Sequence, residues 1–208
     1  MTPRERRLRE QGQRRQLILS SAREMAEAEG WDFVTTRRLA ERIEYSQPVL
    51  YQHFKNKDAI VHAVALEGFG ELAGALHAAR VRHAEADPLE ALDAVARAYL
   101  AFAAKGPVLY QAMLTLDAGG TGYAADPGDP GDAEPVAPQP VLDALAEIRL
   151  AVEPVALGRD PELLTEVLWS TWHGLATLTR GRRLRPDLTQ ERLAALTGIL
   201  TGPAAPVG

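Results

Sequence analysis

Residues 35–57 constrain the fold most, because they predict two short helices joined by a tight turn and followed by the start of a third helix. They read TTRRLAERIEYSQPVLYQHFKNK. Thr36 is expected to cap the first helix, and Leu39 and Ile43, four residues apart, lie on its apolar face. The apolar pattern then breaks and resumes, as expected for a compact helical hairpin.

The second predicted helix leaves an outward face without acidic residues. Ser46 can cap this helix, and Leu50 and Phe54 form its apolar side. Its outward positions carry hydrogen-bonding and small apolar groups: Gln47, Pro48, Val49, Tyr51, Gln52 and His53. Such a surface suits entry into the major groove of DNA. An ordinary hairpin of helices would explain the turn but not the basic residues on both flanks.

These residues resemble the DNA-binding domain of the tetracycline-repressor (TetR) family of bacterial regulators. Tyr51, His53, Phe54 and Lys57 stand where that family has its LY-x-H-F/V-x-x-K pattern, and the resemblance covers about the first seventy residues. It implies an all-α homodimer of about nine helices per chain. A three-helix, helix-turn-helix DNA-binding domain would occupy residues 1–62, with its motif at about 36–55. A helical ligand-binding and dimerisation domain would occupy residues 63–208.

The resemblance also implies roles for particular side chains. Gln47, Pro48 and Val49 would read bases, and Arg37 would reach a guanine edge. Four residues, in the first turns of two helices and on the groove-facing side, would contact phosphates: Thr36, Tyr51, His53 and Lys57. Gln52 and Lys55 are also expected among the DNA-binding residues.

One residue departs from the family pattern. Glu44 lies in the turn where the family usually has Gly, and a left-handed turn residue other than Gly costs about 1 kcal/mol. We therefore expect a differently shaped turn. A carboxylate near phosphates also favours a remote alternative, a helical interaction scaffold without DNA binding, against which Tyr51, His53, Lys55 and Lys57 argue.

Charge is divided unevenly along the chain. Residues 1–62 carry 12 Lys and Arg against 9 Asp and Glu, a balance of +3, and residues 63–208 carry 11 against 19, a balance of −8. A cationic head and an anionic body suit a DNA-binding protein with a net charge of −5. With no cysteine, no apolar leader and no apolar run of membrane-spanning length, we expect a soluble cytoplasmic protein.

The N-terminus is an arginine-rich arm, residues 1–15, ahead of a first helix expected at about 10–29. Such an arm can stay disordered until DNA is present and then lie along phosphates or in the minor groove. A solubilising tail is the alternative. Leu17, Ile18, Ala22, Met25 and Ala26 are expected on the buried side of the helix, with Trp31 and Phe33 in the core of the small domain.

The remaining helices follow from apolar periodicity and from Asp-Pro start signals at 87–88 and 160–161. We expect them at about 57–82, 88–104, 108–116, 141–155, 161–180 and 187–200. Residues 117–140 are rich in Gly, Pro and Asp and predict a long loop. That loop is either a lid over a ligand entrance or a plain excursion.

Residues 167–178, VLWSTWHGLATL, resemble the tryptophan-histidine-glycine (WHG) signature of one C-terminal subfamily of these regulators. Gly174 inside a helix costs about 1 kcal/mol relative to Ala, which indicates close approach of another helix. We expect a dimer contact at Thr171, Gly174, Leu175 and Leu178, with packing inside one subunit as the alternative.

A ligand pocket is expected in the body, lined by large side chains that are individually more typical of core: Phe69, Leu72, Tyr99, Phe102, Tyr110, Met113, Trp169, Trp172 and His173. Their chemistry favours a small apolar or aromatic ligand. No catalytic arrangement, metal site or cofactor motif emerges, because His77 and His83 are six residues apart and His173 stands alone. The prediction is a homodimeric repressor released from a palindromic DNA operator by that ligand. An activator, or a DNA binder that needs no ligand, is the alternative.

Overall fold

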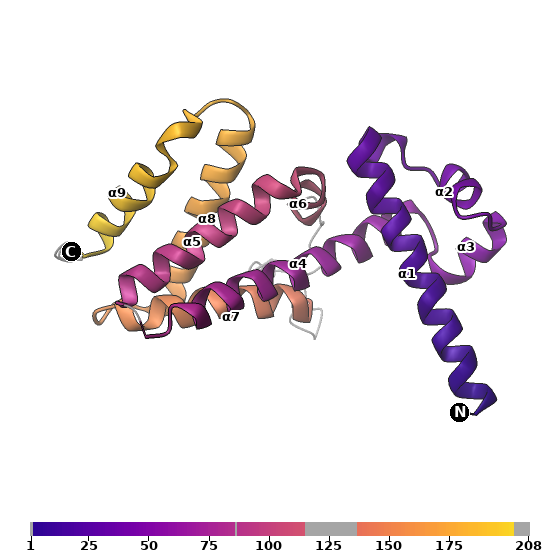
Figure 1. Cartoon of the computed structure of the whole chain (residues 1–208), viewed down its shortest axis with the longest axis horizontal. Helices are drawn as coiled ribbons and strands as arrows, with labels where there is room; N and C mark the ends of the chain where they lie inside the picture. The colour runs from indigo at the N-terminus through magenta and orange to yellow at the C-terminus, as the bar shows by residue number, and fades with distance from the viewer. Residues whose placement is uncertain (1, 86, 115–136, 202–208) are drawn as a thin grey trace, which may run out of the picture. The chain divides into compact units, whose positions relative to one another are not determined.

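The computed structural model describes residues 2–85, 87–114 and 137–201 (Figure 1). Within these ranges the chain forms nine α-helices and three short 3-10 turns, and no strand. The prediction of an all-α fold is confirmed. The chain divides into two compact units, residues 1–68 with 108–137 and residues 69–107 with 138–208. Helix α4 (Lys57–Arg82) runs through both units.

The first unit holds α1 (Pro3–Glu29), α2 (Thr36–Arg42) and α3 (Gln47–His53), with most of α6 (Pro107–Leu114). Its core includes Ile18, Ala22, Leu39, Leu50 and Phe54, as expected. The expectations that Leu17 and Phe33 are buried were wrong. Leu17 is 41% exposed and Phe33 is 58% exposed. The 3-10 turn η1 (Trp31–Phe33) directs Val34 inward in place of Phe33.

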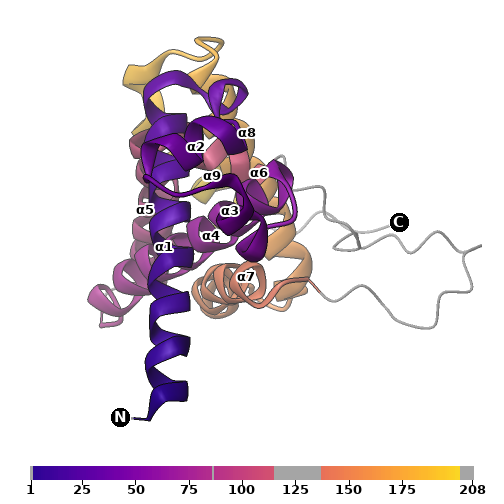
Figure 2. The ribbon, with the colours of Figure 1, turned by 90° about the vertical axis from the view of Figure 1, so that its right-hand side faces the viewer.

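Helix α1 begins earlier than expected, at Pro3. Thr2 and Glu5 form a reciprocal capping box: the Thr2 amide donates to Glu5 Oε2 at 2.7 Å, and the Glu5 amide donates to Thr2 Oγ1 at 3.2 Å. The arm is therefore helical, and it extends beyond α2 and α3 (Figure 2). Because an α-helix is about 10–12 Å across and the minor groove of undistorted DNA is about 6 Å wide, a helical arm fits along the phosphates better than inside that groove.

The turn between α2 and α3 has the left-handed geometry that Gly would favour, with Glu44 at a φ of 57°. The Tyr45 amide donates to the Ala40 carbonyl at 3.0 Å, and the Glu44 amide donates to the Glu41 carbonyl at 3.3 Å. These two bonds form a Schellman motif, which closes the end of α2. The expected change in turn shape does not occur, and Glu44 bears the conformational cost.

The capping residues differ from expectation at one helix. Thr35, not Thr36, caps α2, and its Oγ1 accepts the Arg38 amide at 3.2 Å. Ser46 holds the N-cap position of α3 as expected, but its side chain makes no cap hydrogen bond.

The second unit is built around α5 (Pro88–Lys105), α7 (Gln139–Val152) and α8 (Pro161–Arg180), which pack against one another. Asp87 and Asp160 cap α5 and α8 as the Asp-Pro signals predict. The 3-10 turn η2 (Glu153–Val155) follows α7, and η3 (Pro186–Leu188) precedes α9 (Thr189–Thr201). Most of the predicted loop at 117–140, and with it the lid hypothesis, lies outside the described residues.

Helix α4 corrects the expectation that the chain has no apolar run of membrane-spanning length. An 18-residue window of this helix has a mean hydropathy of 1.4, so its length and composition would suit a membrane span. Half of that window is buried within the fold, including Ile60, Val64, Leu72 and Leu76. This pattern identifies α4 as a core helix.

Candidate nucleic-acid interface and ligand-binding core

The helix-turn-helix brings two predicted phosphate contacts together. Thr36, in the first turn of α2, and Tyr51, on the outward face of α3, have their hydroxyl oxygens 3.4 Å apart. Tyr51 is 50% exposed. Two neighbouring hydroxyls on one exposed surface can both donate to a phosphate, as side-chain hydroxyls do in protein–DNA complexes.

The three arginines of α2 have different surroundings. Arg38 forms a forked ion pair with Glu29 at 2.8 and 2.9 Å, and Arg42 pairs with Glu24 at 2.9 Å. Both pairs fasten α2 to α1. Among the described residues, Arg37 pairs with Glu41 alone, on its own helix at 3.0 Å, and its side chain is 78% exposed. An exposed pair of this kind contributes about 0.3–0.5 kcal/mol, so Arg37 can readily exchange it for a base.

Helix α3 presents most of the predicted reading residues to solvent. Gln47, Pro48 and Gln52 are exposed, as is Lys55 just beyond the helix. Val49 and His53 are half-buried. The opposite side of the segment is anchored by the buried Leu50 and Phe54. The outward face expected from the sequence is therefore present, and it carries no carboxylate.

Lys57 has a structural contact that the sequence did not reveal. Its Nζ donates to the backbone oxygen of Trp31 at 2.6 Å, which fastens the start of α4 to η1. Asn56 caps the same helix end by accepting the Ala59 amide at 2.9 Å. An ammonium has three donors, so this contact leaves Lys57 able to meet a phosphate as well.

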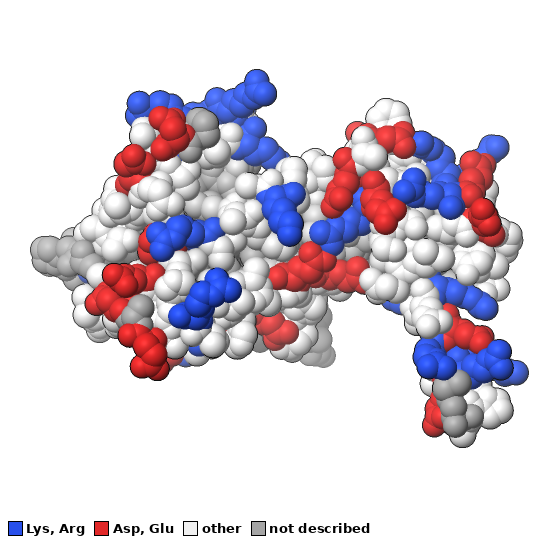
Figure 3. Space-filling model, in the orientation of Figure 1, with Lys and Arg blue, Asp and Glu red and all other residues white. Residues whose placement is uncertain are grey.

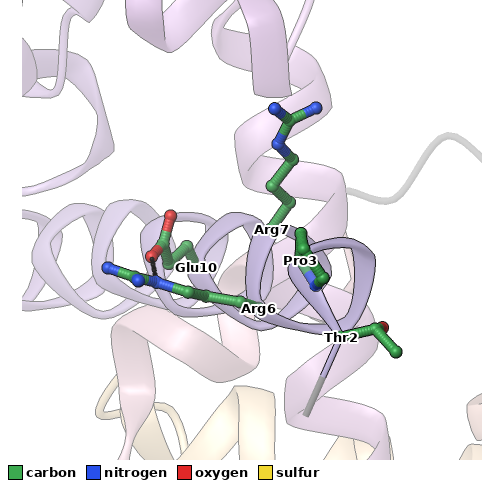
Figure 4. A pocket seen from close by; sticks show the side chains of 5 residues that line it. All are labelled: Thr2, Pro3, Arg6, Arg7 and Glu10. Atoms are coloured by element: carbon green, nitrogen blue, oxygen red, sulfur yellow. Dashed lines mark hydrogen bonds and ion pairs between the residues drawn. The ribbon is translucent and has the colours of Figure 1, made fainter.

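The arm carries acidic and basic side chains interleaved around its surface (Figure 3). Arg6 pairs with Glu10 at 2.9 Å, and an open hollow of about 400 Å³ lies beside them, also lined by Thr2, Pro3 and Arg7 (Figure 4). None of these residues belongs to the predicted ligand pocket. Near the other end of the arm, the Arg15 guanidinium lies 4.4 Å from the centroid of the Phe54 ring. This cation–π contact holds the arm against α3.

The predicted pocket residues are divided between the two units. Tyr110 and Met113 are buried in the first unit, where α6 lies so close to α4 that a Cβ on Gly68 would stand 2.9 Å from Met113 Sδ. The others belong to the second unit, where Phe102, Trp169 and His173 are half-buried and four are buried: Phe69, Leu72, Tyr99 and Trp172.

Aromatic side chains of α5 and α8 meet in the second unit. The Trp169 Nε1 donates to the Tyr99 hydroxyl at 3.1 Å, and the Tyr99 and Trp172 rings lie 5.8 Å apart at 48°. Burial, aided by the positive charge of Arg180, lowers the pKa of the neighbouring His173. That histidine is consequently neutral at pH 7.

Another cluster links α4 to α7. Glu147 accepts from Arg80 Nε at 2.7 Å and contacts His77 Nδ1 at 3.0 Å. Burial acts to raise the pKa of Glu147, but the bonds from Arg80 and His77 outweigh it, so the pKa is lowered. This ion pair was not predicted, because its members are 67 residues apart in the sequence.

The outward face of α8 carries a stripe of apolar and small residues opposite the buried Leu168 and Trp172. Leu163, Val167 and Leu178 are exposed by 58%, 48% and 37%. Thr171 and Gly174 lie between them at helical spacing, half-buried, as is Leu175 beside them. Among the described residues, no atom lies within 4 Å of a Cβ built on Gly174. Within one chain, therefore, the close helix contact expected at Gly174 is not made.

These features define a class of protein: an all-α, DNA-binding regulator with a helix-turn-helix in its first unit and a separate helical body. Residues 18–64 match the family described as bacterial regulatory proteins, tetR family. Residues 92–198 match the tetracyclin repressor-like C-terminal domain. The chain belongs to the TetR family, and it is a DNA-binding transcription regulator and not an enzyme.

Individual proteins resemble the chain over very different shares of its length. The chain is 47% identical over 51 residues to the class C tetracycline repressor protein of Escherichia coli, an alignment that spans 24% of this chain and 23% of that protein. A protein of unknown function from Rhodococcus sp. RHA1 shares the fold with a TM-score of 0.70 and 26% identity over 90% of this chain and 93% of its own.

A second solved structure, RolR in complex with resorcinol, has a TM-score of 0.64 and 18% identity over 92% of this chain and 89% of its own. At that identity the similarity shows the fold alone.

Proposed function

We propose that the chain is a homodimeric repressor that a small apolar or aromatic molecule releases from a palindromic operator. The observation that carries this proposal is that the chain has two distinct surfaces. One is formed by the outward face of α3 together with Arg37, and the other is the apolar stripe on α8. The first suits base reading, and the second suits a helix of a second copy. Two copies would present two reading heads to half-sites about 34–36 Å apart.

For DNA binding, the exposed Arg37 supports a contact to guanine, since Arg38 and Arg42 are occupied by ion pairs to α1. Gln47, Pro48 and Val49 would read neighbouring bases from α3. The hydroxyl pair would contact phosphates together with His53, Lys55 and Lys57, with Gln52 beside them. The helical arm would follow phosphates outside the minor groove.

For dimerisation, open space at Gly174 supports a partner helix on the stripe formed by Leu163, Val167, Thr171, Gly174 and Leu178. Leu175 would lie at its edge. The proposal also includes the resemblance of residues 167–178 to the WHG signature. It places the boundary between the DNA-binding domain and the ligand-binding domain near residue 62, and it places the protein in the cytoplasm.

For ligand response, the aromatic side chains of the second unit support a site for an apolar molecule. RolR forms a complex with resorcinol, and this example of a small aromatic ligand on the same fold supports the proposal. Helix α4 would carry the response, because Phe69 and Leu72 lie on the part in the second unit and Lys57 begins the part in the first. By linkage, a tenfold release requires about 1.4 kcal/mol of differential affinity.

The experiment is a mobility-shift titration of the DNA upstream of the chain's own gene, combined with sedimentation and a promoter fusion. We expect two chains per site and lower transcription. Gly174→Leu should raise the dimer dissociation constant, whereas Gly74→Leu, at another helical glycine with open space, should not. One chain per site, a dimeric Gly174→Leu variant at low micromolar concentration, or increased transcription would contradict the corresponding part of the proposal.

A further inference from the structure

Trp172 has a buried donor without an acceptor. Its side chain is 1% exposed, and among the described residues its Nε1 has no hydrogen-bond partner. An indole N–H can only donate. Buried donors are nearly always paired, so an unpaired one calls for an explanation such as a bound molecule.

The neighbouring indole, in contrast, has an acceptor in the described part of the chain. Trp169, one helical turn earlier on α8, donates its Nε1 to the hydroxyl oxygen of Tyr99 on α5 at 3.1 Å. Trp172 meets the same tyrosine through its ring, with centroids 5.8 Å apart. The phenol therefore bonds one indole and only packs against the other. Helices α5 and α8, which carry these residues, pack against each other (Figure 1).

The surroundings of Trp172 favour a neutral acceptor. Residues 161–179 of α8 contain no Lys or Arg, and Arg97 on α5 forms an ion pair with Asp93. Burial keeps the adjacent His173 neutral. Arg180, whose charge acts on His173, lies about 12 Å further along the α8 axis from Trp172 and donates to the Pro107 carbonyl at 3.1 Å. A carboxylate placed at Trp172 would therefore be desolvated without a paired cation, which is strongly unfavourable. A carbonyl oxygen can accept the indole proton without that penalty.

We propose that Trp172 Nε1 is the hydrogen-bonding end of a ligand site in the second unit, and that the site takes an apolar aromatic molecule bearing a neutral carbonyl oxygen. This inference rests on the proposed function in that it requires the second unit to bind a ligand. Thr177 Oγ1 is also buried without a partner. It lies five residues further along α8, about 140° around the helix, and is not part of this site.

The test uses 2-acetylnaphthalene and its matched hydrocarbon 2-ethylnaphthalene as probes of the full-length protein. The three tryptophans, Trp31, Trp169 and Trp172, give three indole N–H resonances in a proton–nitrogen correlation spectrum. Trp172→Phe removes one and assigns it. We expect the ketone to shift that resonance downfield and to bind about tenfold more tightly than the hydrocarbon, as one net hydrogen bond implies. In calorimetry, Trp172→Phe should abolish the tenfold preference.

Trp31→Phe is the matched control, because Trp31 belongs to the first unit and its donor is already bonded to the Val108 carbonyl. This variant should keep the preference for the ketone. If the Trp172 resonance does not move, or if the wild type binds both probes equally, the inference is wrong, and a buried water then satisfies the indole. Binding of neither probe at millimolar concentration would also overturn it.

The outcomes separate this inference from the proposed function. Equal binding of both probes, with operator release by each, would remove the role of Trp172 but leave a ligand-released repressor. Ketone binding through Trp172 without any change in operator affinity would support the site and contradict ligand-released repression.

Discussion

The indole Nε1 of Trp31 donates a hydrogen bond to the backbone oxygen of Val108 at 3.1 Å, across 77 residues of sequence. It fastens the start of α6 to the 3-10 turn that follows α1. Gly68 provides a second close contact in the same unit, to Leu109 and Met113 of α6. Although the sequence assigns α6 to the ligand-binding body, it packs as part of the DNA-reading unit.

Trp31→Phe should lower the free energy of unfolding by at least about 0.5–1.5 kcal/mol, the usual net contribution of such a bond, because it removes the donor together with part of the half-buried indole. Chemical denaturation measures this change. Phe33→Ala is the control: with its side chain 58% exposed, it should change stability by less than about 0.5 kcal/mol. Equal effects of the two substitutions would mean that the Trp31 bond contributes nothing.

Gly68→Ala and Gly74→Ala should differ, although both glycines lie inside α4. No atom lies within 4 Å of a Cβ on Gly74 in the described chain, so alanine there should stabilise the helix by about 0.8–1 kcal/mol. A Cβ on Gly68 would meet Leu109 and Met113 at 2.9 Å, and overpacking costs about 1–3 kcal/mol. In thermal unfolding, the Gly74→Ala variant should have a higher midpoint temperature than the Gly68→Ala variant. A higher midpoint temperature for Gly68→Ala would show that Leu109 and Met113 of α6 move aside at little cost.

The helix boundaries were largely predictable because their signals are local. Asp160 followed by Pro161 placed the start of α8, and Asp87 with Pro88 placed that of α5. The early start of α1 also had a local signal, Thr2 with Glu5 three residues later, which the arginine-rich composition obscured.

The errors arose where neighbouring residues are equivalent by type or where contacts are distant. Thr35 and Thr36 are equally good caps, and only the backbone selects Thr35. Phe33 and Val34 are both apolar, and a single 3-10 turn decides which one is buried. Contacts such as Arg38 with Glu29, Trp31 with Val108 and Lys57 with Trp31 have no periodic signal, so the sequence could not show which basic residues are structurally occupied.

Lys55→Ala and Lys57→Ala should both weaken binding to all DNA sequences. Each should also reduce, by about one, the slope of the logarithm of the binding constant against the logarithm of the salt concentration, as the loss of one phosphate contact implies. Only Lys57→Ala should also lower stability, because its Nζ bonds to the Trp31 carbonyl at 2.6 Å. Titrations at several salt concentrations, with denaturation of each variant, measure both effects. An unchanged salt slope for Lys57→Ala would restrict that residue to a structural role.

His173 should make the protein less stable in mild acid. Its pKa is lowered in the folded state by burial and then by Arg180, so below about pH 6.5 the unfolded chain binds a proton that the folded chain resists. Stability contributed by neutral His173 is thus present above that pH and declines as the pH falls toward the folded pKa. His173→Gln should flatten this part of the pH profile of unfolding. An unaltered profile in His173→Gln would contradict the assignment.

The most direct test of sequence reading by α2 and α3 compares Arg37→Ala with Arg38→Ala on the site that the wild-type protein selects from random DNA. Arg37→Ala should relax discrimination at one position of each half-site by about 1–3 kcal/mol without loss of stability. Arg38→Ala should lower stability, because it breaks the pair with Glu29, and leave discrimination intact. If the wild type selects no sequence, or if Arg37→Ala weakens binding to the selected site and to random DNA equally, this account of the reading surface is wrong.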